Sequence, residues 1–130
     1  MRTESTKPNV LPDFLTERLK VVFVGTAASD VSARKGHYYA NKSNAFWRLL
    51  HETGLTDRIL QPEEDAKVVE YGLGLTDVIK TEHSGADSKL QASQDDRRIL
   101  DGKIKRFTPH LLCFTSKNAF KAYGHRAEHF

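Results

Sequence analysis

The chain has 130 residues, of which 38% are hydrophobic and 28% charged, with a formal net charge of +3 and a pI near 9.0. This length and apolar content fit one globular domain. No stretch approaches the roughly 18 apolar residues of a membrane helix, and the N-terminal sequence lacks the apolar region of a secretory signal. The single cysteine, Cys113, excludes an internal disulfide. We therefore expect a cytoplasmic protein, and its mildly basic balance favours an anionic partner.

The first half of the chain predicts one strand and two helices after a polar segment. Residues 1–16 contain two prolines and are expected to be a tail or lead-in outside the core, so that the domain proper spans residues 17–130. Residues 19–26 (LKVVFVGT) are a continuous apolar run that predicts a buried parallel strand. Two helices are expected next, over residues 43–54 and 61–72.

The second half predicts further strands separated by a long helix. Residues 73–79 are expected to be a short strand or extended core segment, and residues 83–88 a loop. Apolar residues at helical spacing predict a helix over residues 88–107, in which Gly102 could mark a break. Residues 109–116 (PHLLCFTS) predict a strand that buries its cysteine as an inert thiol, and another helix follows.

Strands that alternate with helices predict an α/β fold with a mostly parallel central sheet and helices on its faces. Ligands of such sheets bind beyond the carboxyl ends of the strands. Two loops are expected at that edge, over residues 26–44 and 115–117. We therefore expect the ligand at the first of these loops.

Basic and aromatic residues gather in and just after this loop. Residues 31–50 hold four basic residues and no acidic one, together with the aromatic residues Tyr38, Tyr39, Phe46 and Trp47. This combination suits a nucleic-acid strand, because cations contact phosphates and rings stack on bases. A solvated basic loop beside core aromatics explains the same pattern, and both interpretations stay open.

Three short motifs follow the start of the first predicted strand. The strand ends in Gly25-Thr26-Ala27-Ala28-Ser29, and residues 54–56 read Gly-Leu-Thr. Between them lies a spaced set formed by Gly36, Tyr39, Ala40, Asn44, Phe46 and Trp47. Together these motifs resemble the mismatch-specific uracil/thymine DNA glycosylases of the uracil-DNA glycosylase superfamily, over roughly residues 19–124. The resemblance implies a three-layer α/β sandwich that acts in base-excision repair.

The resemblance also implies a reaction and a partner. Such an enzyme hydrolyses the N-glycosidic bond of uracil, or of a related damaged or mismatched base, in single- or double-stranded DNA. It extrudes the base from the stack and holds it in a pocket. The family needs no cofactor or metal, and we expect none here. His125 and His129 have helical i, i+4 spacing, but no third ligand accompanies them at convincing spacing.

Residue roles carry over from the matching motifs. The resemblance places the base against a floor formed by Gly25, Thr26, Ala27 and Ser29, and it places the Tyr39 ring on the base. Asn44 could orient the base, but either Asn44 or Ser43 could also be the N-cap of the helix over residues 43–54. Phe46 and Trp47 are assigned to the core. Candidates for contacts with DNA phosphates are Arg34, Lys35 and Lys42.

Two features depart from the family. Ala27 occupies the position where the best-known members have an asparagine that positions the attacking water, and alanine cannot hydrogen-bond water. Nearby polar substitutes are Ser29, Asp30, Asn41 and, further off, Asp77. Asn41 is the first choice because it follows Tyr39 on the loop that would enclose the base. Asp30 is the second, because a carboxylate can stabilise positive charge that develops on the sugar.

The second departure is at the end of the chain. The family's second motif, a Pro-Ser-type loop that enters the minor groove, does not follow Tyr123, and we therefore expect a C-terminally incomplete domain with an exposed sheet edge. We expect a monomer unless that edge associates. A non-catalytic or degenerate DNA-binding fragment of the same fold is the alternative function.

Overall fold

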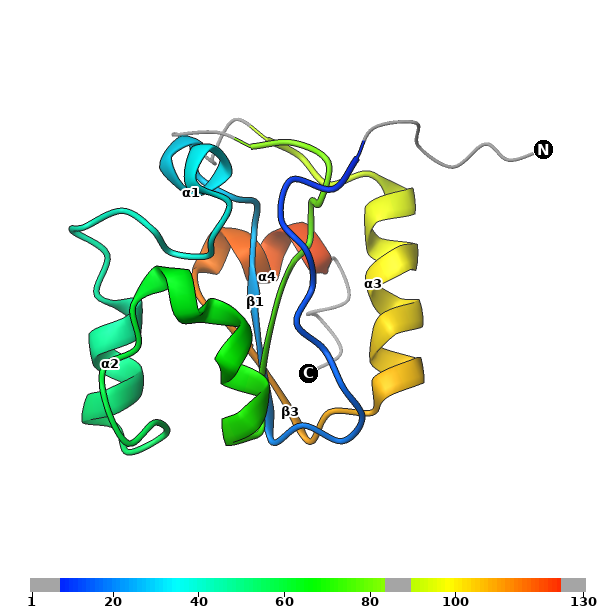
Figure 1. Cartoon of the computed structure of the whole chain (residues 1–130). Helices are drawn as coiled ribbons and strands as arrows, with labels where there is room; N and C mark the ends of the chain where they lie inside the picture. Colours follow the sequence, from blue (N-terminus) through cyan, green and yellow to red (C-terminus); the bar gives the residue numbers. More distant parts are fainter. Residues whose placement is uncertain (1–7, 84–89, 125–130) are drawn as a thin grey trace.

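The computed structural model describes residues 8–83 and 90–124. Its centre is a parallel three-stranded sheet (Figure 1). The strand order is β2-β1-β3. The strands are Val21–Gly25 (β1), Leu73–Asp77 (β2) and Leu111–Phe114 (β3). Each strand lies within a segment expected to be extended. The predicted α/β fold, with a parallel sheet flanked by helices, is confirmed.

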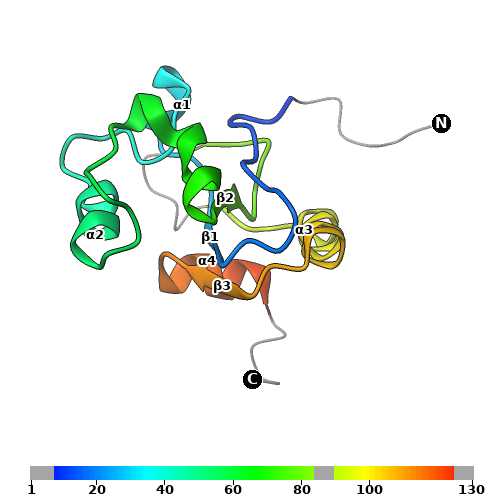
Figure 2. The ribbon, with the colours of Figure 1, turned by 60° about the horizontal axis from the view of Figure 1, so that its bottom comes forward.

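Helices cover both faces of the sheet. They are α1 (Asp30–Lys35), α2 (Phe46–Glu52), the 3₁₀ helix η1 (Pro62–Tyr71), α3 (Gln94–Phe107) and α4 (Lys117–Tyr123). Phe23 packs with α2 and η1 in one core cluster, whereas Val22 and Val24 pack with α3 and α4 in another. Figure 2 shows η1 and α4 on opposite sides of the strands. The alternation of side chains along β1 thus produces three layers.

One helix lies where a loop was expected. Within residues 26–44 the chain forms α1, which begins after Ser29 and ends at Gly36. The Ser29 hydroxyl accepts a hydrogen bond from the Ser32 N–H (3.1 Å), and Gly36 takes a left-handed φ of 79°. These are the usual cap residues of a helix, although this helix has little apolar periodicity.

Two helices begin later than predicted. α3 begins at Gln94, because Ser93 and Asp96 form a reciprocal capping box there. Its Gly102 does not break it. α2 begins at Phe46 with Ala45 as N-cap, so neither residue predicted as the cap fills that position. Most of the loop predicted over residues 83–88 lies outside the described residues.

The segment before β1 is part of the core. Leu11 is 1% exposed, and Phe14 forms an isolated antiparallel bridge with Leu75. Asp13 forms ion pairs with Lys80 (2.9 Å) and Lys103 (2.5 Å). For residues 8–16, the expectation of a lead-in outside the core is therefore wrong. The apolar residues among them add to the β2 side of the sheet.

The prediction that Cys113 is a buried thiol is also wrong. Cys113 is exposed, as is Leu111 two residues earlier, at 63%. β3 is an edge strand, and its alternate residues Leu112 and Phe114 pack against the second core cluster. The opposite side of β3 has no such cover among the described residues. The apolar sequence of β3 predicted burial on both faces of the strand, but only one face is covered among the described residues.

Candidate active site

A pocket of about 540 Å³ opens at the carboxyl ends of the strands. Parallel sheets bind ligands at this edge. Most residues of the predicted site line it, namely Gly25, Thr26, Ala27, Ser29, Tyr39, Asn41 and Asn44. The other predicted residues, which do not line it, are Asp30, Arg34, Lys35 and Lys42. Asp77 and Thr115 complete the wall from β2 and from the end of β3.

The buried floor of the pocket carries a carboxyl group. Asp77 is the last residue of β2 and pairs with Gly25 across the sheet. A Cβ atom at Gly25 would lie 2.5 Å from Asp77 Oδ1 and 3.3 Å from the Tyr39 hydroxyl oxygen. The absence of a side chain at Gly25 therefore makes room for the carboxyl group beside the tyrosine.

The electrostatic state of Asp77 is unusual. It is 6% exposed, and no described residue forms a hydrogen bond with its carboxyl oxygens. Burial raises the pKa of Asp77 from 3.8 to about 6; Lys80 and Lys103 lower the pKa, and Asp13 adds to the increase. The group is therefore partly protonated near neutral pH, when it can donate as well as accept a hydrogen bond.

A second polar group on the floor lacks a partner. Thr26 Oγ1 is buried, with no hydrogen bond to any described residue. The backbone beside it is fixed, because the Gly25 and Thr26 carbonyls accept hydrogen bonds from Val78 N and Ile79 N, each at 2.8 Å. Buried polar groups are ordinarily paired. An unpaired hydroxyl next to a buried carboxyl on one pocket floor favours a polar ligand.

Tyr39 forms an aromatic wall. Its ring stacks on Phe46, with the centroids 4.0 Å apart and the planes at 28°, and its hydroxyl donates to Thr115 Oγ1 (3.4 Å). Its backbone φ is 51°, in the left-handed region that non-glycine residues seldom adopt. Burial first, and then Asp77, raise the pKa of the Tyr39 hydroxyl, which stays protonated.

The two residues predicted to handle the water differ in their positions. Asn41 lies at the exposed rim of the pocket, where its Oδ1 accepts hydrogen bonds from Ser43 N (3.0 Å) and Ser43 Oγ (2.9 Å). Asp30, at the start of α1, contacts His83 Nδ1 through Oδ1 at 2.8 Å and does not line the pocket. Asn44 is also at the rim, with Oδ1 accepting from Phe46 N.

The residues predicted to contact phosphates are exposed, and each is within two residues in the sequence of one that lines the pocket, such as Ser32 or Asn41, or within three for Lys35. Arg34 and Lys35 are exposed in the last turn of α1, and Lys42 is exposed beside the rim residue Asn41. No ion pair involves these three side chains among the residues that the structure describes. Arg48, the fourth basic residue of this region, pairs instead with Glu52 at 3.0 Å.

The described part of the chain offers no group of three His, Cys, Asp or Glu side chains placed to hold a metal ion. His125 and His129 lie outside it. Within residues 8–83 and 90–124, none of the helices is long and apolar enough to span a membrane.

The sequence model of the uracil DNA glycosylase superfamily matches residues 12–129, which include every residue that lines the pocket except Leu11. The chain belongs to this superfamily. Its structure is also similar to the solution NMR structure of a candidate uracil DNA glycosylase from Methanosarcina acetivorans. The two share 27% sequence identity with a TM-score of 0.62, over 85% of this chain and 71% of that chain.

Within this member of the uracil DNA glycosylase superfamily, Asp77 is a pocket residue to which sequence reasoning gave little weight. It was the most distant of four polar candidates, because 52 residues separate it from Gly25. One signal was available: Asp77 directly ends a strand-like apolar run, where a parallel sheet presents its ligand site. The register of β1 against β2, which the sequence did not reveal, brings it to the floor.

Proposed function

We propose that the protein is a DNA glycosylase of the mismatch-specific type, which hydrolyses the N-glycosidic bond of uracil or a related base in DNA. The observation that carries this proposal is the pocket floor. There the buried Asp77 carboxyl and the unpaired Thr26 hydroxyl lie beside the Tyr39 ring at the ligand-binding edge of the sheet. A planar base with polar edges matches this arrangement.

In this proposal the pocket reads the edge of the base and stacks on its face. The neutral Asp77 carboxyl can accept from the N3–H of uracil and donate to its O4, whereas the ionised form can only accept. Thr26 Oγ1 offers a further donor or acceptor. The Tyr39 ring forms the wall on which the base stacks. Small residues at positions 25 and 27 allow the backbone to approach the ring.

The reaction breaks the bond between the base nitrogen and the sugar C1′, and the electron pair leaves with the base. Water adds to C1′ and releases a proton, giving an abasic site and a free base. Ala27 cannot orient that water. We assign this role to Asn41 at the rim, with Asp30 as the second candidate. For Asn41 this requires its amide to leave Ser43 when DNA binds.

DNA would lie over the pocket mouth, with Arg34, Lys35 and Lys42 on its phosphates. These exposed cations give affinity without sequence preference, and binding should weaken as salt concentration rises. Because superfamily membership implies DNA as substrate, this surface is the natural place for the backbone.

The test is cleavage of a uracil-containing oligonucleotide, single-stranded and paired with guanine, followed by alkali to break abasic sites. The control oligonucleotide carries cytosine in place of uracil. Cleavage at uracil alone supports the proposal, and Tyr39→Ala should abolish it. Tyr71→Phe is the matched control, because Tyr71 contacts Asp57 outside the pocket. This variant should cleave uracil-containing DNA like the wild type.

The alternative is a non-catalytic DNA-binding module. One observation favours this alternative. Ala27 stands where the family has the residue that positions water, and the proposed substitutes Asn41 and Asp30 lie at or outside the pocket rim. Salt-sensitive DNA binding without any cleavage would support this alternative and reject the glycosylase.

A further inference from the structure

The residue before Tyr39 is held at each of its polar atoms. Tyr38 is 2% exposed, and its N–H donates to Asp65 Oδ2 (2.9 Å) while its carbonyl accepts from Trp47 Nε1 (3.2 Å). Its hydroxyl donates to the Pro12 carbonyl (2.7 Å) and accepts from Lys80 Nζ (2.9 Å). Segments far apart in the sequence therefore converge on one tyrosine and fix its backbone.

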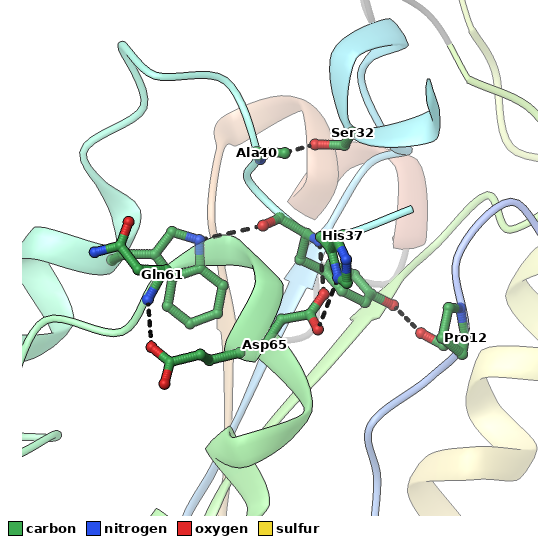
Figure 3. A network of polar contacts seen from close by, with 9 residues as sticks. Pro12, Ser32, His37, Ala40, Gln61 and Asp65 are labelled. Carbon is green, nitrogen blue, oxygen red and sulfur yellow. Dashed lines mark hydrogen bonds and ion pairs between the residues drawn. The ribbon is translucent and has the colours of Figure 1, made fainter. Parts of the chain in front are cut away.

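The residue after Tyr39 is held as well. The Ala40 N–H donates to Ser32 Oγ (3.1 Å), and both groups are buried (Figure 3). Tyr39 thus lies between two anchored residues while it adopts a left-handed φ of 51°. Such a conformation persists in a non-glycine residue only where the surroundings hold it. The anchors therefore set the direction in which the Tyr39 ring enters the pocket.

Asp65 differs from the other anchors because it places a carboxylate in the protein interior. It is 3% exposed and belongs to η1, which contributes no residue to the pocket wall. One oxygen accepts from Tyr38 N and the other contacts His37 Nδ1 at 3.3 Å. A buried carboxylate is costly unless it is hydrogen-bonded, and both of these contacts are to consecutive loop residues.

We propose that Asp65 is a positioning residue for the glycosylase site: its carboxylate fixes Tyr38 and so holds the Tyr39 ring against Phe46, facing the base. This inference rests on the proposed function, because it requires Tyr39 to stack on the base. Asp65 touches neither the base nor the sugar. Its effect reaches the reaction through the backbone of residues 37–40.

The experiment compares the wild type with Asp65→Ala and Asp65→Asn in two assays on the full chain. One is the kcat/KM for uracil excision. The other is the Kd for the matched cytosine duplex, which reports phosphate contacts alone. Asp65→Ala should lower kcat/KM on the order of 10²-fold, the loss typical of a misplaced binding group, and leave the cytosine-duplex Kd within about twofold. Asp65→Asn should restore most of the activity, because its amide oxygen still accepts from Tyr38 N–H.

Glu64→Gln is the matched control. Glu64 neighbours Asp65 on η1 but forms an ion pair with Arg58 at 2.7 Å, away from the pocket. The kcat/KM of Glu64→Gln should therefore equal that of the wild type. If circular dichroism shows that Asp65→Ala does not fold, Ser32→Ala releases the other side of Tyr39 and should give the same selective loss.

The outcomes separate the two proposals. A wild type that does not cleave uracil overturns the proposed function and this inference with it. An active wild type whose Asp65→Ala variant cleaves equally well overturns the inference alone. A variant that loses uracil excision and cytosine-duplex binding in equal proportion, without rescue by asparagine, shows a merely structural role and also overturns it.

Discussion

Replacement of the buried Asp77 carboxyl by an amide should stabilise the protein in a pH-dependent way. The folded-state pKa of Asp77 is about 6 against an ordinary value of 3.8, so the folded protein binds this proton more tightly than the unfolded chain. Its contribution to stability is therefore full below pH 3.8 and is lost as the pH rises to about 6. Two pKa units correspond to about 3 kcal/mol of unfolding free energy. Asp77→Asn has no such loss.

Urea denaturation between pH 4 and pH 8 measures this effect. The gain of Asp77→Asn over the wild type should be larger at pH 8 than at pH 4 by about 2.4 kcal/mol, with most of the change between pH 4 and pH 6. The other carboxylates titrate in both proteins and cancel in the difference. Asp95→Asn is the control, because Asp95 is 73% exposed and should show no pH-dependent difference. A gain for Asp77→Asn that is constant across the range would refute the reasoning.

Three further substitutions test other parts of the structure. Gly25→Ala should destabilise the fold by roughly 1–3 kcal/mol in urea denaturation, because the new Cβ would lie 2.5 Å from Asp77 Oδ1. The control is Gly102→Ala, because a Cβ at Gly102 would have open space around it. Equal stability of the two variants would contradict the close approach at Gly25. Asp13→Asn should destabilise the fold by about 3 kcal/mol at pH 7, because it removes the partner of a buried lysine. Burial raises the pKa of Asp13, but its lysine partners outweigh this effect and lower the pKa below 3.8. The loss of unfolding free energy in Asp13→Asn, relative to the wild type, should therefore shrink as the pH falls below 3.8. A loss that does not change between pH 7 and pH 3 would argue against the ion pairs. Lys42→Gln should lower the slope of log K for DNA against log salt by about 1, and an unchanged slope would exclude Lys42 from the phosphate contacts.

The strands were predictable because each is a continuous apolar run, whereas α1 was not. Asp30–Lys35 contains a single large apolar residue, so helical periodicity could not reveal it. A different signal was present in the sequence. Ser29 and Gly36 stand at the cap positions, with an acid in the first turn and bases in the last. Caps and charges complementary to the helix dipole thus identify short helices that periodicity misses.

The candidate site was predictable in location but not in its deepest residue. The motif residues from Gly25 to Asn44 are close in sequence, so their gathering on one edge followed from a single strand and loop. Asp77 reaches the same place through the register of β2, which depends on packing across the whole sheet. The same limit applies to Leu11, which is buried in a segment that the Phe14–Leu75 bridge joins to β2.

The exposed thiol on β3 is a labelling site close to the proposed DNA-binding surface. Cys113 is the only cysteine in the chain and is solvent-accessible, so a maleimide dye would attach at one known position without any engineered mutation. It lies two residues before Thr115, whose hydroxyl contacts Tyr39 in the pocket wall. A fluorophore at this thiol would therefore sense a nucleic-acid strand docking over the pocket in real time, whether or not a base is then released.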